Sequence, residues 1–184
     1  MTATLTAQST NVVGIRRSDK GWIAAWWQRG PQDRWRLTGV TIGHPNPNAA
    51  IASFTQAAEL SVSDKLEEEQ EQLLDRLRDV VHGQMDTLAD VELNLDHLGP
   101  FTRKVIQRCR KIPAGKTMTY GELAAACGSP NAARAVGNAM ATNRFPLIIP
   151  CHRVVGSGGC LGGFSAPQGI ELKRQLLQRE GAKI

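Results

Sequence analysis

The sequence predicts an α/β protein of the α+β type. We expect an N-terminal antiparallel sheet with helices, followed by a mainly helical C-terminal domain that contains a helix-turn-helix. Strand-like runs separated by short turns fill residues 11–43, and apolar residues at helical spacing dominate after residue 97. The charge balance also changes sign close to that point. We therefore predict two domains, 1–96 and 97–184.

The second of these domains is strongly basic. Up to His97 the chain has nine Lys/Arg and fourteen Asp/Glu, net −5, and from Leu98 onward thirteen and three, net +10. Ordinary scatter of solvated charges explains this swing poorly. A basic domain beside an acidic one favours a polyanionic partner, most simply a nucleic acid.

Three runs of β-forming residues open the chain, at 12–15, 22–27 and 35–42. Gly-containing and Asp-containing turns separate them, which predicts an antiparallel meander. All four tryptophans lie here, at positions 22, 26, 27 and 35. They could stack on bases, but aromatic residues in strands usually pack in the sheet, and we favour sheet packing.

Two helices are expected next. Asn46 resembles an N-cap with Pro47 at the first helical position, and apolar residues follow at helical spacing up to residue 58. A second amphipathic helix is expected over 64–81, with glutamates in its first turn, where the helix dipole favours negative charge. We interpret these glutamates as a solvated face. A short strand is expected over 91–95.

The second half predicts four helices. Gly99-Pro100 opens the first, and Thr119 with Glu122 forms a capping box for the next, which ends at Gly128. Ser129-Pro130 is expected to start another helix at once, so that the pair makes a helix-turn-helix. A final basic helix is expected over 170–179.

The second helix of that pair carries mostly Ala and Gly, with Arg134 as its one long cationic side chain. A major-groove reader normally presents Arg, Asn or Gln to the bases. Small residues allow close approach instead, so the pattern favours a minor-groove binder that inserts a wedge. The alternative is a packed alanine-rich helix with a solvated arginine.

An apolar run at 148–155 holds Cys151, His152 and Arg153 side by side. Buried Arg and His are unfavourable unless paired, so we interpret this stretch as a buried scaffold that carries a reactive site. A thiol nucleophile needs a base or a positive field. Adjacent side chains diverge, so His152 needs a turn or a bridging water to reach the thiol, and a carboxylate to orient it. A structural Cys beside a satisfied His is the alternative.

Only three acids lie in the second half. The capping box already explains Glu122, which leaves Glu171 and Glu180 as candidate partners of His152. No assigned acid remains for Arg153, and we expect it to tie the domains or the C-terminal helix together, with an acid of the first half as a possible partner.

No metal site or membrane segment is expected. The four cysteines form no CxxC pair and show no ligand spacing with the histidines, so we expect free thiols and no metal or other cofactor. The N-terminus lacks the features of a signal peptide, and no apolar run reaches the roughly 20 residues of a membrane span. We therefore expect a cytoplasmic, nucleoid-associated protein.

At the central stretch the sequence resembles the O6-alkylguanine-DNA alkyltransferases, the methylated-DNA–protein-cysteine methyltransferase family. The residues that carry the resemblance cover about 100–181. They are the active-site signature Ile149-Pro150-Cys151-His152-Arg153-Val154-Val155, the upstream Ala132-Ala133-Arg134-Ala135-Val136-Gly137 with Asn143, and the earlier Phe101-Thr102 and Thr119-Tyr120-Gly121-Glu122-Leu123-Ala124.

The resemblance implies repair of DNA by irreversible transfer of the alkyl group from a flipped O6-alkylguanine to Cys151, once per molecule. It implies a relay from Glu180 through His152 and a water to Cys151. Arg134 would fill the space of the flipped nucleotide. The implied catalytic residues are Cys151, His152, Glu180, Asn143 and Tyr120. The implied DNA-binding residues are Arg134, Tyr120, Ala132, Ala133, Ala135, Gly137 and Ser157. The implied substrate-binding residues are Val154, Phe164, Ser165 and Met140.

The implied partner is double-stranded DNA, met through its minor groove, and we expect a monomer in solution and no membrane contact. Two departures stand out. Phe164 stands where many relatives have a tyrosine. The stretch of residues 166–169 is slightly longer than in many members of the family, which shifts the alignment of the acids that follow and keeps Glu171 as the alternative to Glu180. Other interpretations are a binding module without transfer, which Cys151 argues against, a helix-turn-helix transcription factor, and a cysteine hydrolase with turnover.

Overall fold

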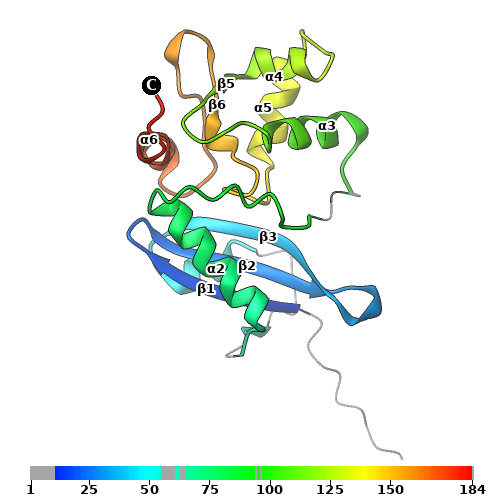
Figure 1. Ribbon diagram of the computed structural model, residues 1–184, viewed down its shortest axis with the longest axis vertical. Coiled ribbons are helices and arrows are strands. Elements are labelled where there is room, and N and C mark those ends of the chain that lie inside the picture. Colours follow the sequence, from blue (N-terminus) through cyan, green and yellow to red (C-terminus); the bar gives the residue numbers. More distant parts are fainter. Residues whose placement is uncertain (1–10, 55–60, 63–64, 94, 96, 184) are drawn as a thin grey trace, which may run out of the picture.

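The computed structural model describes residues 11–54, 61–62, 65–93, 95 and 97–183. Its elements form two lobes, one around the N-terminal sheet and one of helices around a small second sheet (Figure 1). The first lobe contains β1 (Asn11–Ser18), β2 (Gly21–Arg29), β3 (Trp35–His44), α1 (Pro47–Ala52), β4 (Ser61–Val62) and α2 (Glu68–Val81). The second contains α3 (Pro100–Cys109), β5 (Met118–Thr119), α4 (Tyr120–Ala126), α5 (Ala133–Ala141), β6 (Val154–Val155) and α6 (Gly169–Arg179).

The first sheet confirms the predicted meander, because β1 pairs antiparallel with β2 and β2 with β3. The order of the strands is β3-β2-β1-β4. The short β4 lies parallel to β1 and was not predicted.

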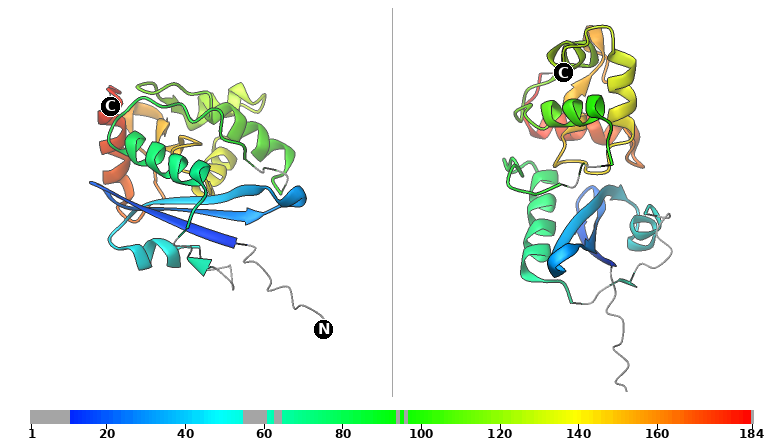
Figure 2. Two further views of the ribbon diagram at one scale, coloured as in Figure 1. Left: turned by 60° about the horizontal axis from the view of Figure 1, so that its bottom comes forward. Right: turned by 90° about the vertical axis from the view of Figure 1, so that its right-hand side faces the viewer.

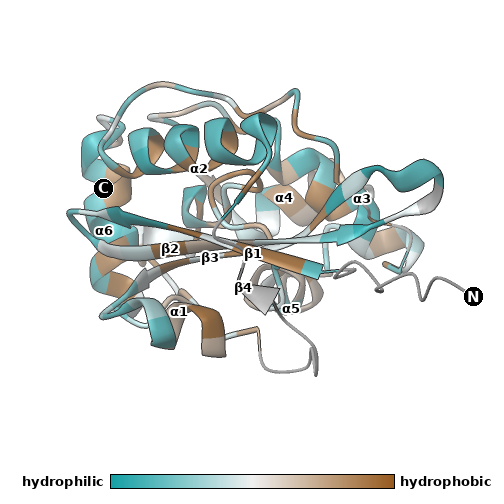
Figure 3. Ribbon diagram, turned by 90° about the horizontal axis from the view of Figure 1, so that it is seen from below, coloured by the Kyte–Doolittle hydropathy of each residue, from teal (hydrophilic) through white to brown (hydrophobic). Residues whose placement is uncertain are grey.

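Alternate residues of β2 face the two sides of this sheet, as the two-residue period of a strand requires. Ile23 and Trp27 belong to the main core with α2, whereas Trp22 and Trp26 pack with α1 on the other face. Figure 3 shows the sheet between these two helices. The predicted sheet packing of these three tryptophans is confirmed, and Trp35 packs against the main core.

The cap of α1 is as predicted, with the Asn46 side chain accepting from the Ala49 amide at 2.8 Å and Pro47 in the first turn. The helix itself ends at Ala52, and residues 55–60 lie outside the described part. The helix α2 begins at Glu68, after a capping box between Glu67 and Gln70.

The expected strand at 91–95 is wrong for residues 91–93, which form no strand. The Arg110 guanidinium holds this part of the chain, since its Nη2 donates to the carbonyls of Leu88 at 2.8 Å and Val91 at 2.6 Å. A cationic side chain thus takes the place of a neighbouring strand as hydrogen-bond donor.

The helix-turn-helix is formed by α4 and α5. The capping box of Thr119 and Glu122 is confirmed. The predicted start of the second helix at Ser129-Pro130 is wrong, because α5 begins at Ala133. The residue before a proline is disfavoured in the helical region, and the turn closes instead through the Ala132 amide to the Ser129 carbonyl at 2.9 Å.

The two lobes meet along β3 and α6 (Figure 2). The Val40 amide donates to the Arg144 carbonyl at 2.7 Å, and Gln168 donates to the Gly43 carbonyl at 3.0 Å. The other end of α6 is held by Arg179, which pairs with Asp19. The edge strand is therefore covered by the second lobe, as sheet edges require. Within the described part of the chain, none of the helices combines the length and apolar character that crossing a bilayer demands.

Candidate active site

The Cys151 loop begins with a tight turn that Asn143 holds closed. The Asn143 amide donates to the Ile149 carbonyl at 2.9 Å, and its oxygen accepts from the Phe145 amide at 3.0 Å. Leu147 within this turn has φ +73°, which is unfavourable for a branched side chain. Both ends of the turn are thus bound by one side chain, which fixes the backbone just before Cys151.

A single 3₁₀ turn, Cys151–Arg153, carries the three chemical side chains. All three residues are buried. The strand β6 that follows pairs parallel with β5, and Tyr120 comes directly after β5. This pairing brings the N-terminus of α4 beside the Cys151 turn, although the two segments are far apart in sequence.

His152 is oriented by Glu180. Its Nε2 lies 2.9 Å from Glu180 Oε1, and the two side chains are 1% and 7% exposed. An ionised carboxylate only accepts hydrogen bonds, so Nε2 carries the proton and Nδ1 has the free lone pair. Nδ1 is buried and has no partner among the described residues. The imidazole is therefore built as a base with one available acceptor atom.

Arg153 completes the array from the other side. Its Nε and Nη2 donate to the Glu180 carboxylate at 3.0 and 2.7 Å, and its Nη1 donates to the Ile112 carbonyl at 2.6 Å. The expectation that Arg153 ties in the C-terminal helix is correct, because Glu180 is the C-cap of α6. An acid of the first half as its partner is wrong: the acid that Arg153 meets is Glu180.

The protonation states follow from burial and these contacts. Burial raises the pKa of Glu180, but hydrogen bonds from His152 and Arg153 outweigh it and bring the pKa to about 2. Burial lowers the pKa of His152, which keeps the imidazole neutral at neutral pH. Burial raises the pKa of the Cys151 thiol, against which a hydrogen bond with Asn143 and the charge of Lys173 act. The resting state is therefore a thiol beside a neutral base and a carboxylate.

The alternative acids lie elsewhere. Glu171 is exposed and pairs with Arg174 and Gln175 on its own helix. Glu122 caps α4. The geometry thus brings Glu180, and neither of these acids, to His152.

The exposed residues of α5 are alanines except for Arg134 and Asn138. Arg134 and Ala135 are exposed, Ala132, Ala133 and Gly137 are half-buried, and a Cβ built on Gly137 meets open space. Arg134 makes no ion pair with the described residues. This helix can therefore lie close against a flat surface while one guanidinium projects from it.

The predicted substrate-binding residues lie on several segments. Met140 and Val154 are buried, Phe164 is half-buried against the core, and Ser165 is exposed. The loop before Phe164 packs on Tyr120, since a Cβ on Gly162 would lie 2.8 Å from the Tyr120 hydroxyl. Burial raises the pKa of Tyr120, so its hydroxyl stays protonated as a donor. Ser157 is exposed in the 3₁₀ turn Ser157–Gly159.

Sequence reasoning missed Lys173. This lysine is completely buried on α6, and its Nζ donates to the Val154 carbonyl at 2.6 Å. The signal was present in the spacing: Leu172, Leu176 and Leu177 form the apolar face of α6, and residue 173 falls on the same face.

The cysteines are free thiols, with Cys109, Cys127 and Cys151 buried and Cys160 exposed. Among the described residues, no group of three His, Cys, Asp or Glu side chains is arranged to hold a metal ion.

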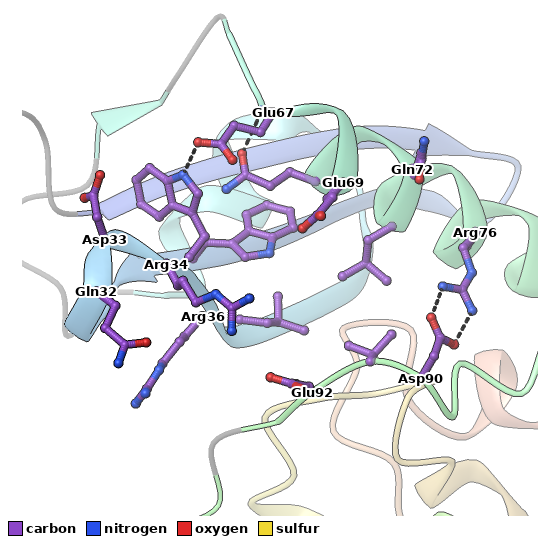
Figure 4. Close-up of a pocket in the computed structure, with 16 residues that line it drawn as sticks. Gln32, Asp33, Arg34, Arg36, Glu67, Glu69, Gln72, Arg76, Asp90 and Glu92 are labelled. Atoms are coloured by element: carbon purple, nitrogen blue, oxygen red, sulfur yellow. Dashed lines mark hydrogen bonds and ion pairs between the residues drawn. The ribbon is translucent and has the colours of Figure 1, made fainter.

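A separate cavity of about 740 Å³ lies between β3, α2 and residues 90–92. Figure 4 shows Arg34 and Arg36 at one side, and Glu69 and Glu92 near α2 and the connecting segment. Its lining includes five acids and three arginines but no thiol, imidazole or hydroxyl. The cavity therefore offers no thiol or hydroxyl nucleophile, and its acidic lining suits a polyanion poorly, so the Cys151 turn is the candidate active site.

Comparison with known proteins adds independent findings. Residues 100–182 match the family model for the 6-O-methylguanine DNA methyltransferase DNA-binding domain. A methylated-DNA–protein-cysteine methyltransferase of Salmonella typhimurium is 42% identical over 109 residues, which are 59% of this chain and 62% of that protein. The human protein of the same name is 46% identical over 85 residues, 46% of this chain and 40% of the human protein. These alignments thus span less than two thirds of the curated relatives.

Solved structures match over more of the chain. OGT of Mycobacterium tuberculosis in complex with DNA has a TM-score of 0.70 and 29% identity over 92% of both chains. The O6-methylguanine methyltransferase of the same organism has a TM-score of 0.70 and 30% identity over 93% of both chains. Coverage this high includes both lobes. The chain belongs to the O6-methylguanine-DNA methyltransferase family.

Proposed function

We propose that this protein repairs O6-alkylguanine in DNA by transferring the alkyl group to Cys151, irreversibly and once per molecule. The observation that carries the proposal is the buried array of Cys151, His152 and Glu180, in which His152 Nδ1 is an acceptor without a partner among the described residues. A structural histidine would have both ring nitrogens satisfied.

The reaction proceeds as a single displacement. Cys151 Sγ attacks the alkyl carbon, the S–C bond forms as the C–O6 bond breaks, and the electron pair passes to the guanine. The thiol proton goes to His152 Nδ1 through a water, because neighbouring side chains diverge, and the Glu180 carboxylate stabilises the imidazolium. Tyr120 donates a hydrogen bond to the departing purine and keeps its own proton. The purine takes up one proton from water, and the His152 imidazolium returns the thiol proton to water, so protons lost and gained balance.

The base reaches the site by flipping out of double-stranded DNA that lies against α5 along its minor groove. Arg134 fills the space of the flipped nucleotide, and the neighbouring small residues allow the close approach. Val154, Phe164, Ser165 and Met140 receive the base. Within this proposal, residues 97–184 carry DNA binding and catalysis, and residues 1–96 support them. The protein acts as a monomer beside the DNA of the cytoplasm and nucleoid.

The test is an intact-mass measurement after incubation with duplex DNA that contains O6-methylguanine. We expect a mass gain of one methylene per molecule, located on Cys151 by peptide mapping, and repaired DNA equal to the protein added. Unmodified DNA is the control. Product beyond one equivalent would support a hydrolase instead, and tight binding without a mass gain would support a binding module.

Replacing Arg134 by alanine is expected to slow repair of duplex DNA by about tenfold or more, because flipping costs a few kcal/mol and each 1.4 kcal/mol is a factor of ten. Transfer from the free base O6-benzylguanine should change little. The rates on the two substrates measure the difference. Arg17→Ala, an exposed arginine on the other lobe, is the matched control. Equal losses on both substrates would exclude the proposed role of Arg134 in flipping.

A further inference from the structure

Lys173 connects the two backbone segments that frame the candidate guanine site. Its side chain is completely buried, and its Nζ donates to the Val154 carbonyl at 2.6 Å and to the Gly163 carbonyl at 3.3 Å. Val154 directly follows the Cys151 turn, and Gly163 directly precedes Phe164. The ammonium therefore holds both segments in place from behind.

The charge of this lysine has no anion to balance it. No carboxylate forms an ion pair with Lys173 in the described part of the chain, and its bonding partners are neutral carbonyls. Burial lowers its pKa to about 8, so it still carries its charge at neutral pH. A buried ammonium without a counter-ion is unfavourable and normally marks a functional need.

The groups that face Lys173 identify that need. Its charge acts on the Cys151, Cys109 and Cys160 thiols and on the His152 imidazole, and its Nζ lies 6.0 Å from the Tyr120 ring centroid. Cys109 lies at the end of α3 with a pKa raised far above the ordinary range by burial, and Tyr120 stays protonated. Cys151 is the group among these that must become an anion in the proposed reaction.

The other buried cation, Arg153, cannot stabilise a Cys151 thiolate in the same way. Its charge is compensated by Glu180, to which both its Nε and Nη2 are bonded. The structure thus holds one neutralised and one uncompensated cation around the same turn.

We propose that Lys173 is a positioning residue whose uncompensated buried charge stabilises the Cys151 thiolate, while its hydrogen bonds hold the Val154 and Gly163 carbonyls at the base-binding site. The inference rests on the proposed alkyl transfer, to which it adds a source of the positive field. Lys173 keeps its protons throughout, since the thiol proton passes to His152. Charges interact more strongly in a buried site than in water, so the ammonium favours the ionised form of the Cys151 thiol.

The test measures the pKa of Cys151 in the absence of DNA. The rate of iodoacetamide modification at Cys151 is followed against pH by peptide mapping, in a Cys160→Ser background that removes the exposed thiol. Lys173→Gln keeps an N–H donor for the carbonyls but removes the charge. We expect its Cys151 pKa to rise by about one unit or more, which lowers modification at neutral pH by about tenfold. Lys173→Arg keeps the charge and should stay close to the parent protein.

The controls separate charge from structure. Lys116→Gln makes the same change at an exposed lysine and should leave the pKa of Cys151 unchanged. A folded Lys173→Gln variant with the parent pKa would overturn the proposal. If that variant does not fold, a raised Cys151 pKa in folded Lys173→Arg would overturn it equally. The iodoacetamide experiment needs no DNA, so it is independent of the proposed function. If the pKa of Cys151 depends on Lys173 but the parent protein transfers no methyl group from DNA, only the proposed function is rejected.

Discussion

Replacing Cys151 by alanine is expected to abolish alkyl transfer completely while the protein stays folded. The thiol sulfur forms the new covalent bond, and Cys151 is the cysteine that lies in the same turn as His152, directly after the segment that Asn143 holds. Burial raises the pKa values of Cys109 and Cys127, which leaves them as inert thiols. Removing one buried sulfur is expected to lower the free energy of unfolding by about 1 kcal/mol, the scale of a deleted methylene.

Intact mass and binding of DNA that contains O6-methylguanine measure the two sides of this prediction. The variant should bind such DNA with an affinity close to that of the parent protein and gain no mass. Cys127→Ala is the matched control, since it removes a buried thiol at the C-cap of α4 and should transfer normally. A methyl group found on any other cysteine of the Cys151→Ala variant would show that the assignment of the nucleophile is wrong.

Local features of this fold were predictable because they depend on neighbouring residues. The helix caps and the meander follow from short-range hydrogen bonding and from two-residue alternation, and the structure confirms both at Asn46, Thr119 and β1–β3. The buried character of Cys151, His152 and Arg153 was also predictable, since an apolar run enclosed them.

Features that depend on distant partners were not predictable from local pattern. Residues 91–93 have a strand-like sequence, yet the Arg110 guanidinium donates to the Val91 carbonyl. No residue near position 91 indicates that this donor will come from Arg110. Spacing alone left Glu171 and Glu180 open as partners of His152, because only the docking of α6 decides which acid arrives there. The place of Lys173 on the apolar face of α6 was a local signal of burial, but its partners, the Val154 and Gly163 carbonyls, lie on other segments.

The docking of α6 on the N-terminal lobe also explains how Glu180, at the C-terminal end of this helix, is held at His152. Gln168 at one end of α6 bonds to the Gly43 carbonyl, and Arg179 at the other end pairs with Asp19 and donates to the Val81 carbonyl. Glu180 follows Arg179 directly. The N-terminal lobe therefore fixes the helix end that supplies the carboxylate to His152.

Replacing Glu180 by glutamine is expected to lower the free energy of unfolding by about 3–5 kcal/mol, the scale seen when one partner of a buried ion pair is removed. The introduced amide would be neutral, so the Arg153 guanidinium would stay buried without its counter-charge. The same change leaves the His152 imidazolium without its carboxylate, and we expect alkyl transfer to slow by about a hundredfold or more. Urea unfolding and the rate of transfer from O6-methylguanine DNA measure the two effects.

The pH dependence of the free energy of unfolding separates the loss of the Glu180 charge from a general loss of packing. Glu180 has a folded pKa of about 2 against an ordinary value of 4.5, so it contributes about 3 kcal/mol of stability. A depressed carboxyl pKa gives stability that is fully present above pH 4.5 and is lost as the pH falls through 2. The stability gap between the parent protein and Glu180→Gln should therefore narrow over that range.

The matched control for this experiment is Glu171→Gln, which removes an exposed carboxylate from the same helix and should change the free energy of unfolding little. A gap that stays constant from neutral pH to the acid limit would mean that the carboxylate charge is not what holds Arg153 and His152. If the stability gap closes at low pH but Glu180→Gln transfers the alkyl group at the parent rate, the ion pair with Arg153 stabilises the fold and Glu180 has no part in the relay. The charge on Glu180 is expected to serve both purposes, because one carboxylate binds the guanidinium and the imidazole at once.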